Sequence, residues 1–383
     1  MRPIYLDYNA STPIDPLVVD SMRAAMDLGY GNPSSTHWAG SPAKHLLEGS
    51  RRQVADLLHC APEEVVFTSG GSEANNLALK GVFFARRGRP VHIITTQIEH
   101  PSILAPCAFL EREGARVTYL PVDATGLVDP DELRRAMTPD TALVSIMHAN
   151  NETGTVEPIE ECARIAHEHG VLFHTDAAQS VGKIPTRVNE LGVDLLSIAG
   201  HKLYAPKGVG ALYVRSGTRL EPLIHGAGHE SGRRAGTESA LLASALGTAS
   251  TLAAELGSMR VVRELRDQLW KGLQDRLGSS VVLNGHPERR LPNTLNVSFV
   301  GHTGGDILAA VKDIAASTGS ACHSGRVELS PVLRAMGISE EVGRGAIRFS
   351  LGRGTTAAEI HEVLERISCA ARSPGIRLLT GDD

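Results

Sequence analysis

The chain reads VVFTSGGSEANN at residues 65–76, where an apolar run leads into two glycines and then into a helix-forming segment. This order predicts a buried strand, a tight turn and a helix. Backbone N–H groups and the dipole at such a helix N-terminus can bind a phosphate. A tight turn before a serine-capped helix would give the same pattern, so the stretch alone leaves both interpretations open.

Further short apolar runs, alternating with amphipathic segments, follow at residues 91–95, 117–120, 142–146, 171–174 and 194–198. This alternation predicts an α/β fold with a mainly parallel sheet and helices on both faces. The next run, at 211–214, follows a link too short for a helical crossover, so we expect it to be antiparallel. With the strand at 65–68, the sheet has seven strands.

The pattern changes after Ala240. One predicted helix carries an apolar stripe that we interpret as core packing, formed by Val262, Leu265, Leu269, Leu273 and Leu277. Strand-like runs at 294–299 and 346–350, with a helix at about 305–312, predict a smaller α+β domain. We therefore expect a large domain at 14–256, and a small domain formed by 1–13 and 257–383.

Composition excludes several function classes. The 383 residues include 38 basic and 43 acidic side chains with a net charge of -5, which predicts no direct binding of nucleic acid. Apolar runs are too short to span a membrane, and the start lacks a signal-peptide core, so we expect a cytoplasmic protein. Five cysteines without a C-x-x-C pair predict neither a disulfide framework nor a metal site. We expect Cys107, Cys162 and Cys369 to be small buried side chains.

Two further motifs complement the glycine turn. Asp176 lies in HTDAAQ at the end of a predicted buried strand, where a carboxylate needs a cationic or hydrogen-bonding partner. Lys202 lies in GHK just after the next strand. A pyridoxal phosphate site needs a lysine for the aldehyde, a carboxylate for the ring nitrogen and donors for the phosphate. The alternatives are that Asp176 only caps a helix and that Lys202 is a solvated side chain. His100 could stack on the cofactor ring and move protons, and the alternative for it is a cap.

The segment TGSACHSG at residues 318–325 places Cys322 among small residues that favour an adjustable loop. A thiol there could act as a second nucleophile, which suggests sulfur chemistry. An unperturbed thiol has a pKa of about 8.5, and the neighbouring His323 could lower it.

These motifs together resemble the cysteine desulfurase, or NifS-like, family of fold-type I pyridoxal phosphate enzymes in the class V aminotransferase superfamily. The similarity extends over nearly the whole chain. Besides the stretches above, it rests on LDYNA at 6–10, GNPSS at 31–35, ANNETG at 149–154, RAGTE at 234–238 and RFSLGR at 348–353.

The resemblance implies that Lys202 holds the cofactor as a Schiff base and serves as acid and base, that His100 stacks on the ring and that Asp176 binds the ring nitrogen. The residues that it implies for the phenolic oxygen are Gln179 and Asn151; for the phosphate they are Gly71, Ser72, His201 and, from a second subunit, Thr237. For the substrate they are Arg348, which would clamp the carboxylate, with Asn32 and Asn151 assisting.

Two features depart from the family pattern. Ala199 stands where many relatives have a serine, so one hydroxyl donor to phosphate is missing. The sequences ACHS at 321–324 and SPVL at 330–333 look closer to selenocysteine lyases.

The resulting hypothesis is a homodimer that converts L-cysteine to L-alanine and leaves a persulfide on Cys322 for a sulfur-acceptor protein. An iron–sulfur scaffold, a thiolation enzyme and a DNA sulfur-modification system all remain possible acceptors. The alternatives are a selenocysteine lyase acting on L-selenocysteine and releasing selenide, an aminotransferase, and a non-catalytic sulfur-delivery scaffold.

Overall fold

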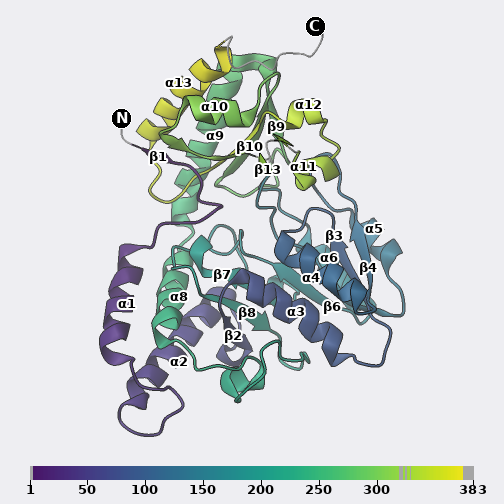
Figure 1. The fold of residues 1–383 in the computed structure, drawn as a ribbon, viewed down its shortest axis with the longest axis vertical. Helices are drawn as coiled ribbons and strands as arrows, with labels where there is room; N and C mark the ends of the chain where they lie inside the picture. Colours follow the sequence, from purple (N-terminus) through teal and green to yellow (C-terminus); the bar gives the residue numbers. More distant parts are fainter. Residues whose placement is uncertain (1–2, 319–321, 324–325, 328, 374–383) are drawn as a thin grey trace.

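The computed structural model describes residues 3–318, 322–323, 326–327 and 329–373. Its main sheet has the predicted seven strands, shown below the C-terminal elements in Figure 1. Their order is β2 (Val65–Thr68), β8 (Gly210–Val214), β7 (Leu195–Ala199), β6 (Leu172–Asp176), β5 (Thr141–Ser145), β3 (His92–Thr96) and β4 (Arg116–Leu120). The pairs from β7 to β4 are parallel, whereas β8 is antiparallel to both β2 and β7. The predicted antiparallel strand is therefore confirmed.

Helices cover both faces of this sheet. Successive strand residues point to opposite sides, and because the residues on both sides are apolar, each face needs helices to bury it. Leu143 and Leu195 pack with α3 (Gly71–Ala85) and α4 (Pro101–Arg112). Their neighbours Val144 and Leu196 pack on the other face, with α2 (Gly40–Leu58), α6 (Ile159–Glu168) and α8 (Ala240–Ala253). The shorter or peripheral helices are α1 (Pro16–Leu28), α5 (Pro130–Ala136) and α7 (Val188–Leu191).

A second core forms around a four-stranded antiparallel sheet, in the order β12 (Ser317–Thr318), β15 (Ala346–Ser350), β10 (Thr294–Phe299) and β9 (Val281–Asn284). The helices beside it are α9 (Gly257–Leu277), α10 (Gly304–Ala310) and α13 (Ala357–Arg372). The predicted stripe on α9 is in this core, with Leu269 and Leu273 fully buried and Leu277 partly buried.

The N-terminal segment joins the C-terminal elements. Strand β1 (Ile4–Tyr5) pairs in parallel with β11 (Ile314–Ala315), and Asp7 forms a bridge with Ser350. These contacts connect the start of the chain with the second core, and the division into two domains stays a prediction.

The segment around Cys322 contains two short paired strands in the region where the sequence predicted a loop. The backbone of β13 (Cys322–His323) pairs with β14 (Arg326–Val327), so that Cys322 lies opposite Val327. The Cys322 side chain and residues 319–321 and 324–325 lie outside what the structure describes. Short helices α11 (Pro331–Ala335) and α12 (Glu340–Gly343) follow.

Within the described residues, no single helix has the length and apolar composition to cross a membrane. Among the helices that the structure describes, one pair passes such a test jointly, α8 and the stretch Gly257–Ser280, and its two members are bent by 72° relative to each other.

Candidate active site

A cavity of about 460 Å³ lies at the carboxyl ends of β6 and β7, which is where parallel sheets bind ligands. Most of the predicted site residues line it: Gly71, Ser72, His100, Asn151, Asp176, Gln179, His201, Lys202 and Arg348. Ala199 also lines the cavity, so a methyl group stands there in place of the serine hydroxyl of many relatives. The fold thus brings residues from five separate motifs to one place.

Asp176 ends β6 and is 93% buried, and its two carboxylate oxygens have different partners. Oδ1 accepts the backbone N–H of Ala178 at 2.9 Å, and Oδ2 accepts Asn75 Nδ2 at 2.7 Å. The alternative considered was a helix cap, but turns and not a helix follow Asp176, so the first contact caps a turn. Since the carboxylate also lines the cavity, capping the turn and facing a ligand are compatible.

His100 is connected to Asp176 through side chains. Asn75 Nδ2 also donates to Ser102 Oγ at 2.8 Å, and Ser102 Oγ lies 2.8 Å from His100 Nδ1. His100 Nδ1 also accepts the backbone N–H of Ser102 at 3.1 Å, so this residue does cap α4 as well as line the cavity. Because Nδ1 is the acceptor, the neutral ring carries its proton on Nε2. Burial lowers the pKa of His100, Lys202 lowers it further and Asp176 opposes the shift, which favours this neutral form.

Lys202 lies in a 3₁₀ turn, Gly200–Lys202, directly after β7. Its Nζ donates to the backbone carbonyls of Asn9 and Ala10, the latter at 2.8 Å. Burial and the charge of Arg348 lower the pKa of Lys202 to about 8, although Asp7 and Asp176 act in the opposite direction. A substantial neutral fraction of this amine is therefore present near pH 7.5.

The glycine turn adopts the predicted strand–turn–helix geometry. Gly70 has φ 150° and ψ -178°, a conformation that L side chains rarely adopt, and α3 begins at Gly71. A Cβ at Gly71 would lie 3.2 Å from the Ala199 Cβ, so the glycine also keeps this end of the cavity open. The first backbone N–H groups of α3 suit an anion here. Nearby, burial lowers the pKa of His201 to about 4, with Lys202 and Lys207 contributing, so its ring is neutral and can donate one hydrogen bond.

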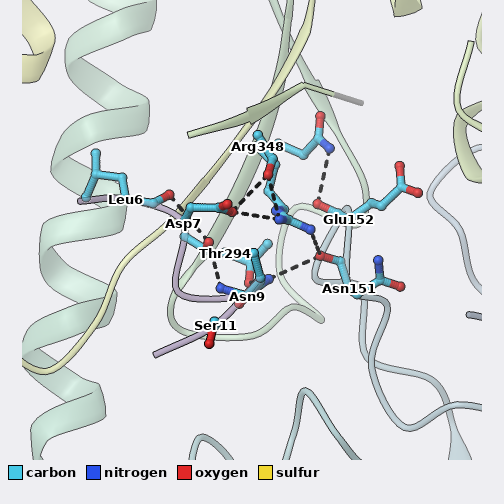
Figure 2. A network of polar contacts seen from close by, with 12 residues as sticks. Leu6, Asp7, Asn9, Ser11, Asn151, Glu152, Thr294 and Arg348 are labelled. Carbon is cyan, nitrogen blue, oxygen red and sulfur yellow. Dashed lines mark hydrogen bonds and ion pairs between the residues drawn. The ribbon is translucent and has the colours of Figure 1, made fainter. Parts of the chain in front are cut away.

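Arg348 is held by residues far away in the sequence (Figure 2). Its Nη2 donates to Asp7 Oδ1 at 2.7 Å and Ser317 Oγ at 2.9 Å, and Nη1 donates to Asn151 O at 2.9 Å. Its Nε is buried and has no partner among the described residues. The predicted carboxylate clamp thus lies in the cavity wall with its plane fixed by Asp7.

Gln179 is held at both ends of its amide. Its Oε1 accepts Lys183 Nζ at 3.0 Å, and its Nε2 donates to Asn9 O at 3.0 Å. Lys183 is buried, although the sequence analysis assigned it no role.

Two predicted residues do not line the cavity of the single chain. Asn32 is exposed and its Oδ1 caps its own turn by accepting the N–H of Ser34 at 2.8 Å, and Thr237 is also exposed. The predicted burial of Cys369 is wrong, because that residue lies on the exposed face of α13. Cys107 and Cys162 are buried as predicted.

Sequence reasoning also missed residues that build the site. Asn75 stands in the opening stretch itself, one helical turn after Gly71, which is a signal that it faces the same ligand. Asp7 and Asn9 stand in the quoted LDYNA motif, but no local pattern predicts what they contact.

The arrangement fits pyridoxal phosphate. Its ring nitrogen needs a buried carboxylate, its aldehyde an amine that is partly neutral, and its phosphate a cradle of backbone donors. Asp176, Lys202 and the Gly71 turn meet these needs in one cavity.

Comparisons with known proteins agree with this geometry. The family described as aminotransferase class-V matches residues 4–363. The cysteine desulfurase IscS of Dictyoglomus turgidum is 48% identical over 373 residues, covering 96% of this chain and 94% of that protein. The mitochondrial cysteine desulfurase of Arabidopsis thaliana is 47% identical and covers 95% of this chain and 81% of that protein. The solved structure of a NifS-like protein has a TM-score of 0.89 at 38% identity and covers 96% of this chain and 98% of that one.

The chain therefore belongs to the aminotransferase class-V family. Within that family it is a pyridoxal phosphate-dependent enzyme of the cysteine desulfurase group. The predictions of fold class, cofactor and enzyme class are confirmed, and these relatives give the selenocysteine lyase alternative no support.

Proposed function

We propose that the cavity is the desulfuration site, in which L-cysteine is converted to L-alanine while its sulfur is transferred to Cys322. The observation that carries the proposal is the presence of Lys202, Asp176 and Arg348 in one cavity, with the lysine amine shifted toward its neutral form. A cationic and a basic group together suit a substrate that is an amino acid.

When bound, pyridoxal phosphate supplies an aldehyde for amines and a ring that takes up the electrons released at the substrate α-carbon. Lys202 serves this chemistry in two ways. Its neutral amine would hold the aldehyde, and the same amine, once free, would accept the proton of the substrate α-carbon and donate one back. The lowered pKa matters for both, since an ammonium group can do neither.

The other side chains orient the reactants. Asp176, fixed by Asn75 and Ala178, would hold the ring-nitrogen proton, and His100 would stack on the ring. Arg348 binds the substrate carboxylate with help from Asn151 and Asn32. Gly71, Ser72 and His201 bind the phosphate, and Gln179 with Asn151 contacts the phenolic oxygen.

Cys322 accepts the sulfur. Its thiolate attacks the substrate sulfur, so an S–S bond forms while the carbon–sulfur bond breaks, and the electron pair stays with the carbon, which is then protonated. Three other thiols are poor candidates, because burial raises the pKa of Cys60, Cys107 and Cys162 to about 12. Cys369 is exposed but does not line the cavity.

The test compares the holoenzyme with Cys322→Ala, with Cys369→Ala as the matched control. We expect Cys322→Ala to keep its visible cofactor spectrum and lose alanine formation from L-cysteine, while Cys369→Ala stays active. Alkylation after exposure to L-cysteine, followed by peptide mass analysis, locates the added sulfur. Full turnover by Cys322→Ala would contradict the assignment.

We also propose that the active form is a homodimer in which Thr237 of each chain reaches the partner's phosphate site. Thr237 is exposed and absent from the cavity lining of its own chain. Large apolar side chains on and after α1 are also exposed: Leu17, Met26, Leu28, Tyr30 and Trp38. Exposed apolar surface of this kind marks an interface. A monomer in sedimentation velocity at micromolar concentration that still held the cofactor fully would refute the proposal.

The persulfide then passes to a sulfur-acceptor protein. We propose a cytoplasmic location, as the sequence analysis predicted. Incubating the persulfide form with candidate acceptors and following the loss of sulfur from Cys322 tests the transfer.

A further inference from the structure

Lys183 is a buried lysine that the proposed chemistry does not use. It lies in the turn after β6, four residues beyond Gln179, and only 9% of it is exposed. Its Nζ donates to Gln179 Oε1 at 3.0 Å, and within the described part of the chain it forms no ion pair. Burying an ammonium group without a counter-ion is costly. A polar role specific to this position would explain why the cost is tolerated.

The contacts of Gln179 show what that role is. A glutamine amide has an oxygen that only accepts and a nitrogen that only donates, and the two ends are nearly equal in shape. The ammonium form of Lys183 can only donate, and the carbonyl of Asn9 can only accept. A flipped amide would place two acceptors together at Asn9 and, with Lys183 protonated, two donors together at Lys183. Lys183 and Asn9 therefore fix one orientation of Gln179, with its NH₂ group on the Asn9 side.

This orientation determines what the cavity offers to a ligand. Gln179 lines the cavity, and only one of the two hydrogens on its Nε2 is needed for Asn9. The second hydrogen is available to an acceptor in the cavity. Were the amide flipped, it would present an oxygen there and repel an anionic phenolic oxygen.

We propose that Lys183 is a positioning residue for the reaction: by holding Gln179 Oε1, it keeps the Gln179 N–H directed at the phenolic oxygen of pyridoxal phosphate. The inference rests on the proposed function, in which Gln179 contacts that oxygen. A donor to the phenolic oxygen withdraws charge from it, so the neighbouring Schiff-base nitrogen of Lys202 holds its proton less tightly. Positioning by Lys183 thus lowers the pH at which this nitrogen deprotonates.

Charge provides a competing explanation that the experiment must separate. Burial lowers the pKa of Lys183 to about 7, and Lys202 and Arg348 lower it further. Arg348, Asp7 and Asp176 also act on Lys202. A positive charge at position 183 would itself favour deprotonation at Lys202, without any help from Gln179.

The experiment is a spectrophotometric pH titration of the holoenzyme, following the visible band of the Schiff base. The variants are Lys183→Met, which removes donor and charge, and Lys183→Gln, which keeps a neutral donor. Gln179→Leu and the Lys183→Met/Gln179→Leu double variant complete a cycle. We expect Lys183→Met and Gln179→Leu each to raise the midpoint by about one unit, the double variant to add nothing further, and Lys183→Gln to stay near the wild type.

The inference is overturned if Lys183→Met leaves the midpoint unchanged, if Lys183→Gln shifts it as far as Lys183→Met, or if the shifts add in the double variant. If Gln179→Leu does not shift the midpoint, Gln179 does not contact the phenolic oxygen, and the inference also fails. A failure of the proposed function would give a different result. In that case Lys202→Ala, loaded with the cofactor, would keep the visible band, because Lys202 would not be the lysine that forms the Schiff base. Should Lys183→Met fail to fold, Lys183→Gln and Gln179→Leu still decide between orientation and charge.

Discussion

The reactivity of Lys202 should depend on pH in a way that an exposed lysine does not. In the apoprotein, burial and Arg348 lower its pKa from 10.5 to about 8. At pH 7.5 about a quarter of the amine is then neutral, against roughly 0.1% of an unperturbed lysine. The neutral amine is the nucleophile, so Lys202 should react about 200-fold faster than an exposed lysine of equal intrinsic reactivity.

Pyridoxal without its phosphate is a suitable probe, because its reaction depends less on the phosphate cradle. The initial rate of formation of the visible band is measured in apoprotein between pH 6.5 and 10, and borohydride reduction with peptide mapping identifies the modified lysine. We expect the rate to rise about tenfold per pH unit below 8 and to level off above it. Lys202→Ala gives the background.

A variant tests the physical cause. Arg348→Met removes the largest charge that lowers the pKa, so the midpoint should move to higher pH. A wild-type midpoint above 10 would refute this reasoning, and so would a label found mainly on the exposed Lys207.

Further predictions concern stability and the clamp. The pKa of Lys183 is about 10.5 in the unfolded chain and about 7 in the folded one, so the unfolded state holds more protons between these pH values. The unfolding free energy of the apoprotein should therefore rise with pH in this window, and it should rise less steeply in Lys183→Met. Urea titrations at several pH values measure both slopes. Asp7→Ala removes the acceptor for Arg348 and Ser317, and we expect it to raise KM for L-cysteine about tenfold or more. Asp7→Asn keeps an acceptor oxygen, so KM should rise far less. Equal effects of the two variants would contradict the role of Asp7 in positioning Arg348. Leu269→Ala, at a fully buried position of the α9 stripe, should cost about 2–5 kcal/mol of unfolding free energy, and a loss below 1 kcal/mol would argue against its core position.

The strands of the main sheet were predictable because burial on both faces favours continuous apolar runs, and the observed β2 begins and ends as predicted. Strand β10 instead alternates polar and apolar residues, the other strand pattern, and it also has its predicted bounds. The antiparallel direction of β8 followed from the link before it, which is too short for a helical crossover. Cys369 was harder, since a cysteine in an amphipathic helix fits either face, and its neighbours place it toward solvent. The hairpin at Cys322 contains two-residue strands, which are too short for a periodic pattern.

The site was only partly predictable, because one segment near the N-terminus holds residues that come from distant parts of the chain. Asp7 binds Arg348, 341 positions away, and Asn9 O accepts both Gln179 and Lys202. Local motifs indicate which residues suit a cofactor, but not what holds them.

These contacts also link the cofactor to the N-terminal segment. To bind the aldehyde, Lys202 must give up at least one of the hydrogen bonds that it makes to Asn9 and Ala10, because a Schiff-base nitrogen has fewer protons than an ammonium group. The carbonyl of Asn9 then keeps Gln179 as its donor, whose other amide end Lys183 still holds. Since β1 of the same segment pairs with β11, binding of the aldehyde by Lys202 would change a contact between the turn after β7 and the segment that pairs with the C-terminal elements.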